Sequence, residues 1–327
     1  MRFENRTRML NLMQLVILAA GFGRRFGGLK QLAPVGPNGQ AIMDYTAFGA
    51  KSCGYEGIIV IVREDIREEI AQYIEKNWPP DLPVVLVNQG PVPGTAQAVL
   101  SAAPYIHGPF GVANADDIYG EPALRALIEH FETGPTGFSS PDEARELHLL
   151  VAYHLVRTVL TDATVTRGLC EVDADDHLMS IEENLVSLRE DGRFDAEPVL
   201  SGAGKSPRVL EGSESVSMNL WGFYPTMLTH LAEAVDSYDA TQSGRRELLL
   251  PEVIGHAVRS GAVKVHVLET DERCIGVTHA EDVSIVHEEL IVAPHEGLIV
   301  APHEELIVAS RPRAAWLNAI TRGRTRH

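Results

Sequence analysis

The chain has 327 residues, a net charge of −17, 45% hydrophobic residues and 22% charged residues. At roughly 150 residues per domain this allows one large or two small domains with a sizeable core. The negative charge argues against a basic face for nucleic acid, and no apolar run reaches the roughly 18 residues of a membrane span. We therefore expect neither nucleic acid nor membrane as a partner.

The three cysteines are Cys53, Cys170 and Cys274, far apart in sequence and without a C-x-x-C pair. This pattern fits a reduced, cytoplasmic protein and makes a zinc site improbable. The sequence leaves the oligomeric state open, with a homo-oligomer among the alternatives.

After a basic extension over residues 1–13, which we expect to be disordered, buried-type strands alternate with amphipathic helices. Strands are predicted at 15–20, 58–62, 84–87 and 110–115, and helices at 44–53, 64–76, 95–103 and 121–133. Strand–helix alternation predicts an α/β fold. We expect a three-layer, Rossmann-like, mainly parallel sheet flanked by helices.

The middle of the chain has a different pattern. It predicts a strand at 149–156, a hairpin at 168–183 that turns at 173–176, a long loop at 189–215, a strand at 216–224, helices at 225–237 and 247–260, and a strand at 263–268. An antiparallel region is thus added to the parallel sheet.

The C-terminal part contains three near-identical octapeptides, HEELIVAP, HEGLIVAP and HEELIVAS, over residues 287–310. Three copies of eight residues are too few for a solenoid. We interpret them as a tandem duplication inside the final helix or tail and assign them no chemistry.

The most informative segment is LAAGFGRRFGGLKQL, Leu18 to Leu32. Its glycines allow backbone N–H groups to approach a phosphate, at the sheet edge where open α/β folds bind ligands. The segment breaks the dinucleotide pattern G-x-G-x-x-G. It also breaks the Walker A pattern, because Leu29 intrudes and neither Ser nor Thr follows Lys30.

This segment resembles the signature L-A-A-G-x-G-x-R…K-Q-L of the nucleoside-triphosphate transferases, a family of sugar-phosphate nucleotidyltransferases with a GT-A-type fold. The resemblance implies that the loop wraps a triphosphate and that Arg25 and Lys30 neutralise charge on its phosphates. The residues that match are Leu18, Ala19, Ala20, Gly21, Gly23, Arg25, Lys30, Gln31 and Leu32.

Two further segments match the family in the same order. PGTAQAV at 93–99 resembles the G-T-A segment that contacts the base, which implicates Gly94, Thr95 and Ala96 in nucleotide binding. NADDIYG at 114–120 resembles the metal-binding aspartate motif, with Asp116 at the metal position and Asp117 at the next, variable one. A hard Mg²⁺ ion favours such a carboxylate. The alternative is a purely structural role, in which Asp116 caps the following helix.

Later matches are looser. SIEEN at 180–184 resembles a segment with a sugar-contacting glutamate, which implicates Glu183, although Asn184 replaces the lysine that often follows. VSMNLWGF at 216–223, with Asn219, and ELLLP at 247–251 look like the acceptor side of some bacterial members. CIGVTHAED at 274–282 resembles the segment of the second metal ligand. Thr278 occupies that ligand's place, and Asp282 lies four residues further on.

The resemblance implies one nucleotidyltransferase domain over residues 14–286, with a nucleotide-binding half at about 14–135 and an acceptor half at about 136–286, before a tail at 287–327. It further implies Mg²⁺-dependent transfer of a nucleotide from a nucleoside triphosphate to a phosphorylated small molecule such as a sugar 1-phosphate, with release of pyrophosphate.

Several alternatives stay open. A cytidylyltransferase for a polyol phosphate, phosphocholine or phosphonate would have the same loop. A molybdenum-cofactor nucleotidyltransferase fits the length less well, and a glycosyltransferase would need D-x-D where this chain has NADD. A non-catalytic nucleotide-binding regulatory protein is the alternative of another class.

Overall fold

The structure is a computed structural model, and it describes residues 13–21, 26–133, 147–161, 163–199, 206–239, 247–277 and 279–292. The first half contributes four parallel strands in the order β4–β1–β2–β3. These are β1 (Gln14–Leu18), β2 (Gly57–Val62), β3 (Val84–Asn88) and β4 (Phe110–Asn114). Leu18 lies opposite Asn114, so the segments that follow β1 and β4 leave the sheet side by side.

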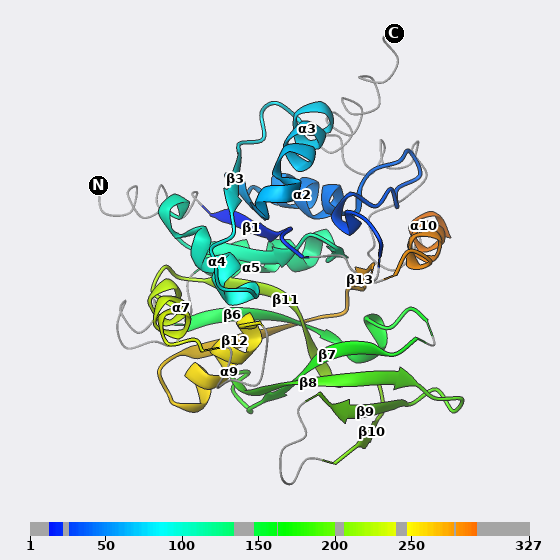
Figure 1. Cartoon of the computed structure of the whole chain (residues 1–327). Helices are drawn as coiled ribbons and strands as arrows, with labels where there is room; N and C mark the ends of the chain where they lie inside the picture. The colour runs from blue at the N-terminus through cyan, green and yellow to red at the C-terminus, as the bar shows by residue number, and fades with distance from the viewer. Residues whose placement is uncertain are drawn as a thin grey trace.

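Helices cover both faces of this sheet (Figure 1). Along β1, Leu15 and Ile17 belong to one core cluster while Val16 and Leu18 belong to the other, as the two-residue period of a strand requires. The first face is covered by α2 (Ile42–Cys53), α3 (Arg67–Asn77) and α5 (Glu121–Thr133), and the second by α4 (Thr95–Ser101), α7 (Met227–Asp236) and α9 (Leu250–Arg259). The predicted three-layer α/β architecture is confirmed.

The second half of the chain extends the same sheet. β11 (Ser215–Phe223) pairs antiparallel along one edge with β4 and, nearer its start, with β7 (Val165–Val172), and along its other edge with β6 (Leu147–His154). The register shifts between Ser217 and Trp221, where β11 passes from β7 towards β4. Beyond these strands, β12 (Lys264–Thr270) lies parallel to β6, and β8 (Leu178–Leu188), β9 (Phe194–Pro198) and β10 (Arg208–Leu210) continue antiparallel from β7.

The predicted loop at 189–215 is wrong in part, because it contains β9 and β10. Phe194, Ala196 and Pro198 are buried while Asp195 and Glu197 are exposed, so β9 has the alternation of a strand with one covered face. The strand is short, and the Gly, Pro and charged residues around it favour the prediction of a loop over that of a strand. The other predicted elements occur within a few residues of their expected bounds, and α5 agrees at both ends.

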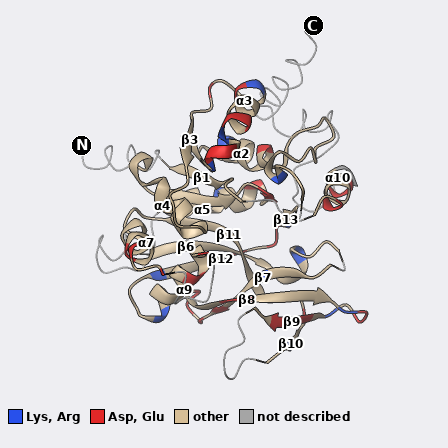
Figure 2. Cartoon of the chain, in the orientation of Figure 1, with Lys and Arg blue, Asp and Glu red and all other residues tan. Residues whose placement is uncertain are grey.

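The described residues also form four short helical turns: η1 (Lys30–Leu32), η2 (Glu64–Ile66), η3 (Ala103–Tyr105) and η4 (Leu155–Arg157). Cys53, Cys170 and Cys274 form no disulfide among the described residues. Figure 2 marks acidic residues on α3, β9 and α10. Within the described segments, no helix combines the length and apolar character needed to cross a membrane.

The last described elements close a third, smaller core. β13 (Ile275–Gly276) pairs with β5 (Asp117–Ile118), and α10 (Asp282–Val292) follows it. Val286 and Leu290 of α10 are buried in one cluster with Val35 and Ile118. The first octapeptide therefore begins inside α10. The rest of the repeat lies outside the described residues, as does the N-terminal extension up to residue 12.

Candidate functional site

A cleft of about 560 Å³ opens at the carboxyl ends of β1 and β4. Its walls come from the exit of β1, the start of α4, the segment after β4, and β11. This is the edge of an open α/β sheet at which ligands usually bind. The predicted residues that line it are Leu18, Ala19, Ala20, Gly21, Lys30, Gly94, Thr95, Asp116 and Asn219.

A second hollow of about 180 Å³ adjoins this cleft. The two share Asn114, Asp116 and Asn219 as walls. After the roles that the resemblance predicts for their lining residues, we call the larger space the nucleotide compartment and the smaller one the acceptor compartment. Glu183 lines the acceptor compartment, so the structure brings both predicted acceptor residues, Glu183 and Asn219, to the same hollow as Asp116.

The exit of β1 is held in place by two polar side chains. Nη1 of Arg63 donates hydrogen bonds to the carbonyl oxygens of Ala20 (3.0 Å) and Gly21 (2.7 Å). The buried Gln31 donates to the carbonyl oxygen of Ala19 at 2.9 Å. Sequence reasoning missed Arg63, although it directly follows β2, the strand that pairs with β1. Gly23 and Arg25 lie outside the described residues, so their roles stay predictions.

Lys30 and Asp116 form an ion pair at the junction of the two compartments. Their side chains are 24% and 20% exposed, so the pair is only partly screened by water. The alternative in which Asp116 caps the next helix is not what the structure shows, because α5 begins at Glu121 and the Asp116 carboxylate contacts Lys30. A carboxylate and a cation thus meet where the two hollows join.

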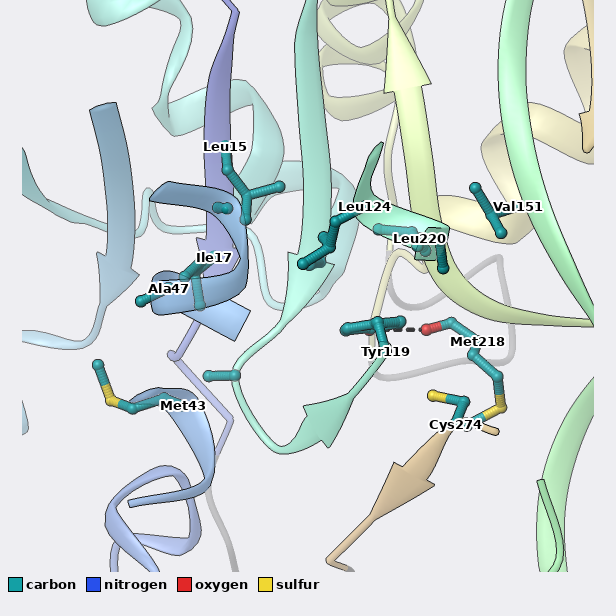
Figure 3. Close-up of a cluster of buried hydrophobic side chains, with 14 of the residues drawn as sticks. Leu15, Ile17, Met43, Ala47, Tyr119, Leu124, Val151, Met218, Leu220 and Cys274 are labelled. Carbon is teal, nitrogen blue, oxygen red and sulfur yellow. Dashed lines mark hydrogen bonds between the residues drawn. The ribbon is translucent and has the colours of Figure 1, made fainter. Parts of the chain in front are cut away.

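Asp117, assigned to a variable position by resemblance, is buried beneath this pair. Burial, and next the charge of Asp116, raise the pKa of the Asp117 carboxyl. Its Oδ2 accepts a hydrogen bond from the Asn114 side chain at 2.8 Å. Next to it, the Tyr119 hydroxyl accepts a hydrogen bond from the Asn114 backbone N–H at 2.8 Å. The same hydroxyl donates to the Met218 carbonyl oxygen at 2.8 Å (Figure 3). These contacts join the end of β4 to β11.

The segment predicted to carry the second metal ligand does reach Asp116. β13 pairs with β5, and the Val277 N–H donates to the Asp116 carbonyl oxygen at 3.0 Å. Thr278 lies outside the described residues. The Asp282 carboxylate instead accepts the His279 N–H at 2.7 Å, at the start of α10, and lines neither compartment in the described part.

Three potential metal ligands, Asp173, Asp175 and His177, cluster elsewhere, in the turn between β7 and β8. The Asp173 carboxylate there accepts the backbone N–H groups of Asp175 and His177, both at 2.9 Å. These bonds close the turn, and none of the three residues lines either compartment.

The G-T-A segment is bound to the ELLLP segment, which resemblance had placed on the acceptor side. The Leu248 N–H donates to the Pro93 carbonyl oxygen at 2.8 Å, and the Ala96 N–H donates to the Leu248 carbonyl oxygen at 3.1 Å. The Thr95 hydroxyl accepts the Leu250 N–H at 2.8 Å, at the start of α9. Ala96 is fully buried in the core and, unlike Gly94 and Thr95, does not line the nucleotide compartment.

Asn219 has a left-handed backbone, with φ of 61°, at the register shift of β11. Asparagine tolerates this conformation better than most residues. Its N–H donates to the Ser217 hydroxyl and its Oδ1 accepts from Trp221 Nε1, both at 3.2 Å. The strained backbone therefore presents Asn219 to both compartments.

The model of the MobA-like NTP transferase domain family matches residues 15–179. The chain belongs to this family. The match includes the β1 exit, the G-T-A segment and Asp116, and ends just inside β8. As an NTP transferase the protein is a nucleotidyltransferase, and the recognition made from the Leu18–Leu32 motif is confirmed. No curated protein matches the sequence.

Solved structures share the fold of this NTP transferase at low sequence identity. The inositol-1-phosphate CTP transferase from T. maritima is 13% identical, with a TM-score of 0.58 over 85% of this chain and 97% of that chain. A putative glucose-1-phosphate thymidylyltransferase from Bacillus anthracis is 13% identical, with a TM-score of 0.59 over 84% and 94%. A UDP-glucose pyrophosphorylase is 14% identical, with a TM-score of 0.52 over 85% and 97%.

Proposed function

We propose that this protein transfers a nucleoside monophosphate from a nucleoside triphosphate to a phosphorylated small molecule, a sugar 1-phosphate in the first instance, and releases pyrophosphate. The observation that carries the proposal is the position of Asp116, paired with Lys30, on the wall shared by two adjoining hollows. A transfer between two phosphorylated substrates needs such a junction.

In the proposed step, an oxygen of the acceptor phosphate attacks the α-phosphorus of the triphosphate. A new P–O bond forms as the bond between the α-phosphorus and the bridging oxygen breaks, and pyrophosphate leaves with its charge. The nucleophile is already an anion, so little proton transfer is required. Positioning and charge neutralisation then dominate catalysis. Lys30 would hold the departing phosphates, with Arg25 as its predicted partner.

The residues at the junction fit a divalent cation. The Asp116 carboxylate is a hard oxygen donor, it reaches both compartments, and it already attracts the cationic Lys30. Mg²⁺ commonly binds one or two protein carboxylates and fills its other positions with phosphate oxygens and water. When bound, Mg²⁺ would neutralise phosphate charge and act as a Lewis acid. The flexible Lys30 side chain could then exchange Asp116 for a phosphate.

Two alternatives remain alongside this proposal. The structural relatives are named for CTP, thymidylyl and UDP chemistry, so the shared fold does not select a base. A cytidylyltransferase for a polyol phosphate, phosphocholine or phosphonate is therefore distinguished by its substrates alone. A regulatory protein would bind a nucleotide and release no pyrophosphate with any acceptor.

The test combines ligand-dependent stability with pyrophosphate release. Thermal unfolding is measured with ATP, CTP, GTP, UTP and dTTP, each with and without Mg²⁺, for the wild type, Asp116→Asn and the control Asp175→Asn. A nucleotide at about 100 times its Kd should add roughly 2.7 kcal/mol. We expect one or two nucleotides to stabilise the wild type and the control in an Mg²⁺-dependent way, and Asp116→Asn to lose this effect.

Pyrophosphate release is then measured with glucose 1-phosphate, inositol 1-phosphate and phosphocholine. We expect Asp116→Asn to reduce the rate at least 100-fold without unfolding the protein. Full activity of Asp116→Asn would refute the proposal, and so would the absence of any nucleotide-dependent stabilisation. Binding without turnover across a broad acceptor panel would favour the regulatory alternative.

A further inference from the structure

The acceptor compartment is acidic, yet the acceptor proposed above brings an anionic phosphate into it. Asp116, Asp117 and Glu183 line this hollow. Among its described lining residues, Arg167 is the one cation. A phosphate placed here without a positive partner would face three carboxyl groups at close range in a partly dry site, which is costly.

Arg167 is held in a fixed position on β7. Its Nε donates to the Thr158 hydroxyl at 3.0 Å and its Nη1 to the Thr166 carbonyl oxygen at 2.8 Å, while Nη2 donates to the Thr158 carbonyl oxygen. A guanidinium has five N–H donors, so two remain without an acceptor in the described part of the chain. The anchored side chain thus keeps part of its hydrogen-bonding capacity for a ligand.

The partners that anchor Arg167 are all neutral, so they do not cancel its charge. Asn184, directly across the β7–β8 pair, is also neutral and fully buried. Arg167 and Asp117 line the same hollow. On the other side, Lys30 forms an ion pair with Asp116. The two adjacent aspartates are thus flanked by two cations, Lys30 in the nucleotide compartment and Arg167 in the acceptor compartment.

We propose that Arg167 binds the phosphate of the acceptor, and that the acceptor is a compact phosphate monoester whose hydroxyl groups contact Glu183, Ser217 and Asn219. This inference rests on the proposed function and deepens it. The planar guanidinium can pair with two phosphate oxygens at once. The three polar side chains line the same hollow and offer hydroxyl-binding groups. Each compartment would then hold one phosphorylated substrate through its own cation.

The experiment uses inorganic phosphate as the probe, with the full chain and a non-hydrolysable nucleoside triphosphate plus Mg²⁺ at saturation. The nucleotide fills the Lys30 side, so added phosphate reports on the acceptor compartment. Phosphate affinity is measured by equilibrium dialysis for the wild type, Arg167→Gln, Arg167→Lys and Thr158→Val. Competition by glucose 1-phosphate and by unphosphorylated glucose shows whether the phosphate group is what is recognised.

We expect Arg167→Gln to weaken phosphate binding about 10- to 100-fold, as loss of a charge-assisted hydrogen-bonding group would, with nucleotide binding unchanged. Arg167→Lys should lose roughly tenfold, because the charge stays and the planar fork does not. Thr158→Val, which removes one neutral partner and leaves the charge, should bind phosphate within about threefold of the wild type. Glucose 1-phosphate should compete and glucose should not.

Equal phosphate affinity of the wild type and Arg167→Gln, with nucleotide still bound, would overturn this inference and leave the proposed function standing. Failure of the wild type to bind any nucleotide would overturn both. If Arg167→Gln does not fold, Arg167→Lys decides, and wild-type phosphate affinity in that variant would count against a bidentate Arg167 contact. Competition by glucose as strong as that by glucose 1-phosphate would also refute it.

Discussion

At the scale of single residues, Arg63 connects the end of β2 to the exit of β1. Its guanidinium is mostly buried and binds two carbonyl oxygens, so it fixes the direction of the neighbouring Gly21 backbone. We expect Arg63→Met to raise the KM for the nucleoside triphosphate roughly 10- to 100-fold, because hydrogen bonds from a charged donor are worth about 1.5–3 kcal/mol. Steady-state kinetics would measure this.

The matched control for Arg63→Met is Asp65→Asn. Asp65 pairs with the same guanidinium but is 66% exposed, and exposed ion pairs contribute little. Asp65→Asn should leave the KM nearly unchanged. Equal effects of the two substitutions would show that the surface ion pair, and not the carbonyl contacts, sets the position of the β1 exit.

Asp44 gives a pH-dependent prediction away from the cleft. Burial raises the pKa of its carboxyl to about 6, although Tyr73, Trp78 and the Ala41 N–H donate hydrogen bonds to it. A raised native pKa means that the folded state retains the proton longer, so this contribution to stability is present below pH 3.8 and is lost as pH rises through about 6. Asp44→Asn does not titrate and should lack this loss.

The measurement for Asp44 is urea unfolding of the wild type and Asp44→Asn from pH 4 to pH 7.5. The difference in unfolding free energy between them should shift against the wild type by about 1–3 kcal/mol over this range. Tyr73→Phe removes a hydrogen bond that favours the carboxylate, so it should move the transition to higher pH. If the unfolding free energies of the wild type and Asp44→Asn changed with pH in parallel, the raised pKa of Asp44 would be contradicted.

The sequence predicts residues that combine into a motif, and the structure brings Gly21, Lys30 and Asp116 to one cleft; the sequence does not predict residues that act through tertiary contacts. Gly21, Lys30 and Asp116 were predicted together because strand exits and glycine spacing carry a recognisable pattern. Arg63 and Tyr119 were missed because each contacts a backbone carbonyl that lies far away in the sequence, Ala20 after β1 and Met218 in β11. One sequence by itself does not show which distant segments pack together, so it gives no signal for such contacts.

At the scale of elements, Gly94 determines how α4 and the start of α9 meet. Its φ is 120°, and a Cβ there would lie 2.2–2.7 Å from backbone atoms of Leu248. Gly94→Ala therefore meets both a strained backbone and a clash with main chain, at about 3 kcal/mol or more. We expect a lower unfolding free energy in urea and weaker nucleotide binding, since Gly94 lines the nucleotide compartment.

Gly261→Ala is the control for Gly94→Ala. Gly261 also has a positive φ, of 73°, but no atom lies within 4 Å of a Cβ placed there. The backbone strain alone should cost about 1–2 kcal/mol, with nucleotide binding unaffected. If the two variants lose equal stability, the close approach of Leu248 is not what requires glycine at position 94.

Elements were predictable in proportion to their length and to the strength of their pattern. β2 has six residues and is buried throughout, and its continuous apolar run predicts a strand. β13 and β5 are two residues each and exist only because they pair with one another. The contact between the G-T-A and ELLLP segments was likewise not predictable. The two segments are separated by about 150 residues, and no local sequence pattern indicates the hydrogen bonds that connect them.

At the scale of the whole molecule, the two predicted halves share one sheet. β11 of the second half pairs with β4 of the first, and the predicted boundary near 135 falls in a segment outside the described residues. The junction of the two compartments lies along this shared pair, with Asn114 and Asp116 from one half and Asn219 from the other. Each compartment is therefore lined by residues of both halves.

The C-terminal elements β13 and α10 pack next to the segment that carries Asp116. α10 buries Val286 and Leu290 in the third core, and His287 Nδ1 lies 2.9 Å from the Val35 carbonyl oxygen. Ending the chain after residue 281 should lower the unfolding free energy by about 2–5 kcal/mol, after the entropy of ordering α10 is subtracted from the burial gain. It should also lower kcat, because β13, which precedes α10, pairs with β5 next to Asp116.

The comparison that isolates α10 is a chain ending after Val292, which retains α10 and removes the end of the first octapeptide, the second and third octapeptides and residues 311–327. We expect its unfolding free energy and kcat to match those of the full chain, since we assign those octapeptides no chemistry. Urea unfolding and pyrophosphate release, measured on both truncations, would check this. A loss of activity on removing residues 293–327 alone would mean that the chain after α10 takes part in the reaction, and the boundary of the catalytic unit would have to move beyond α10.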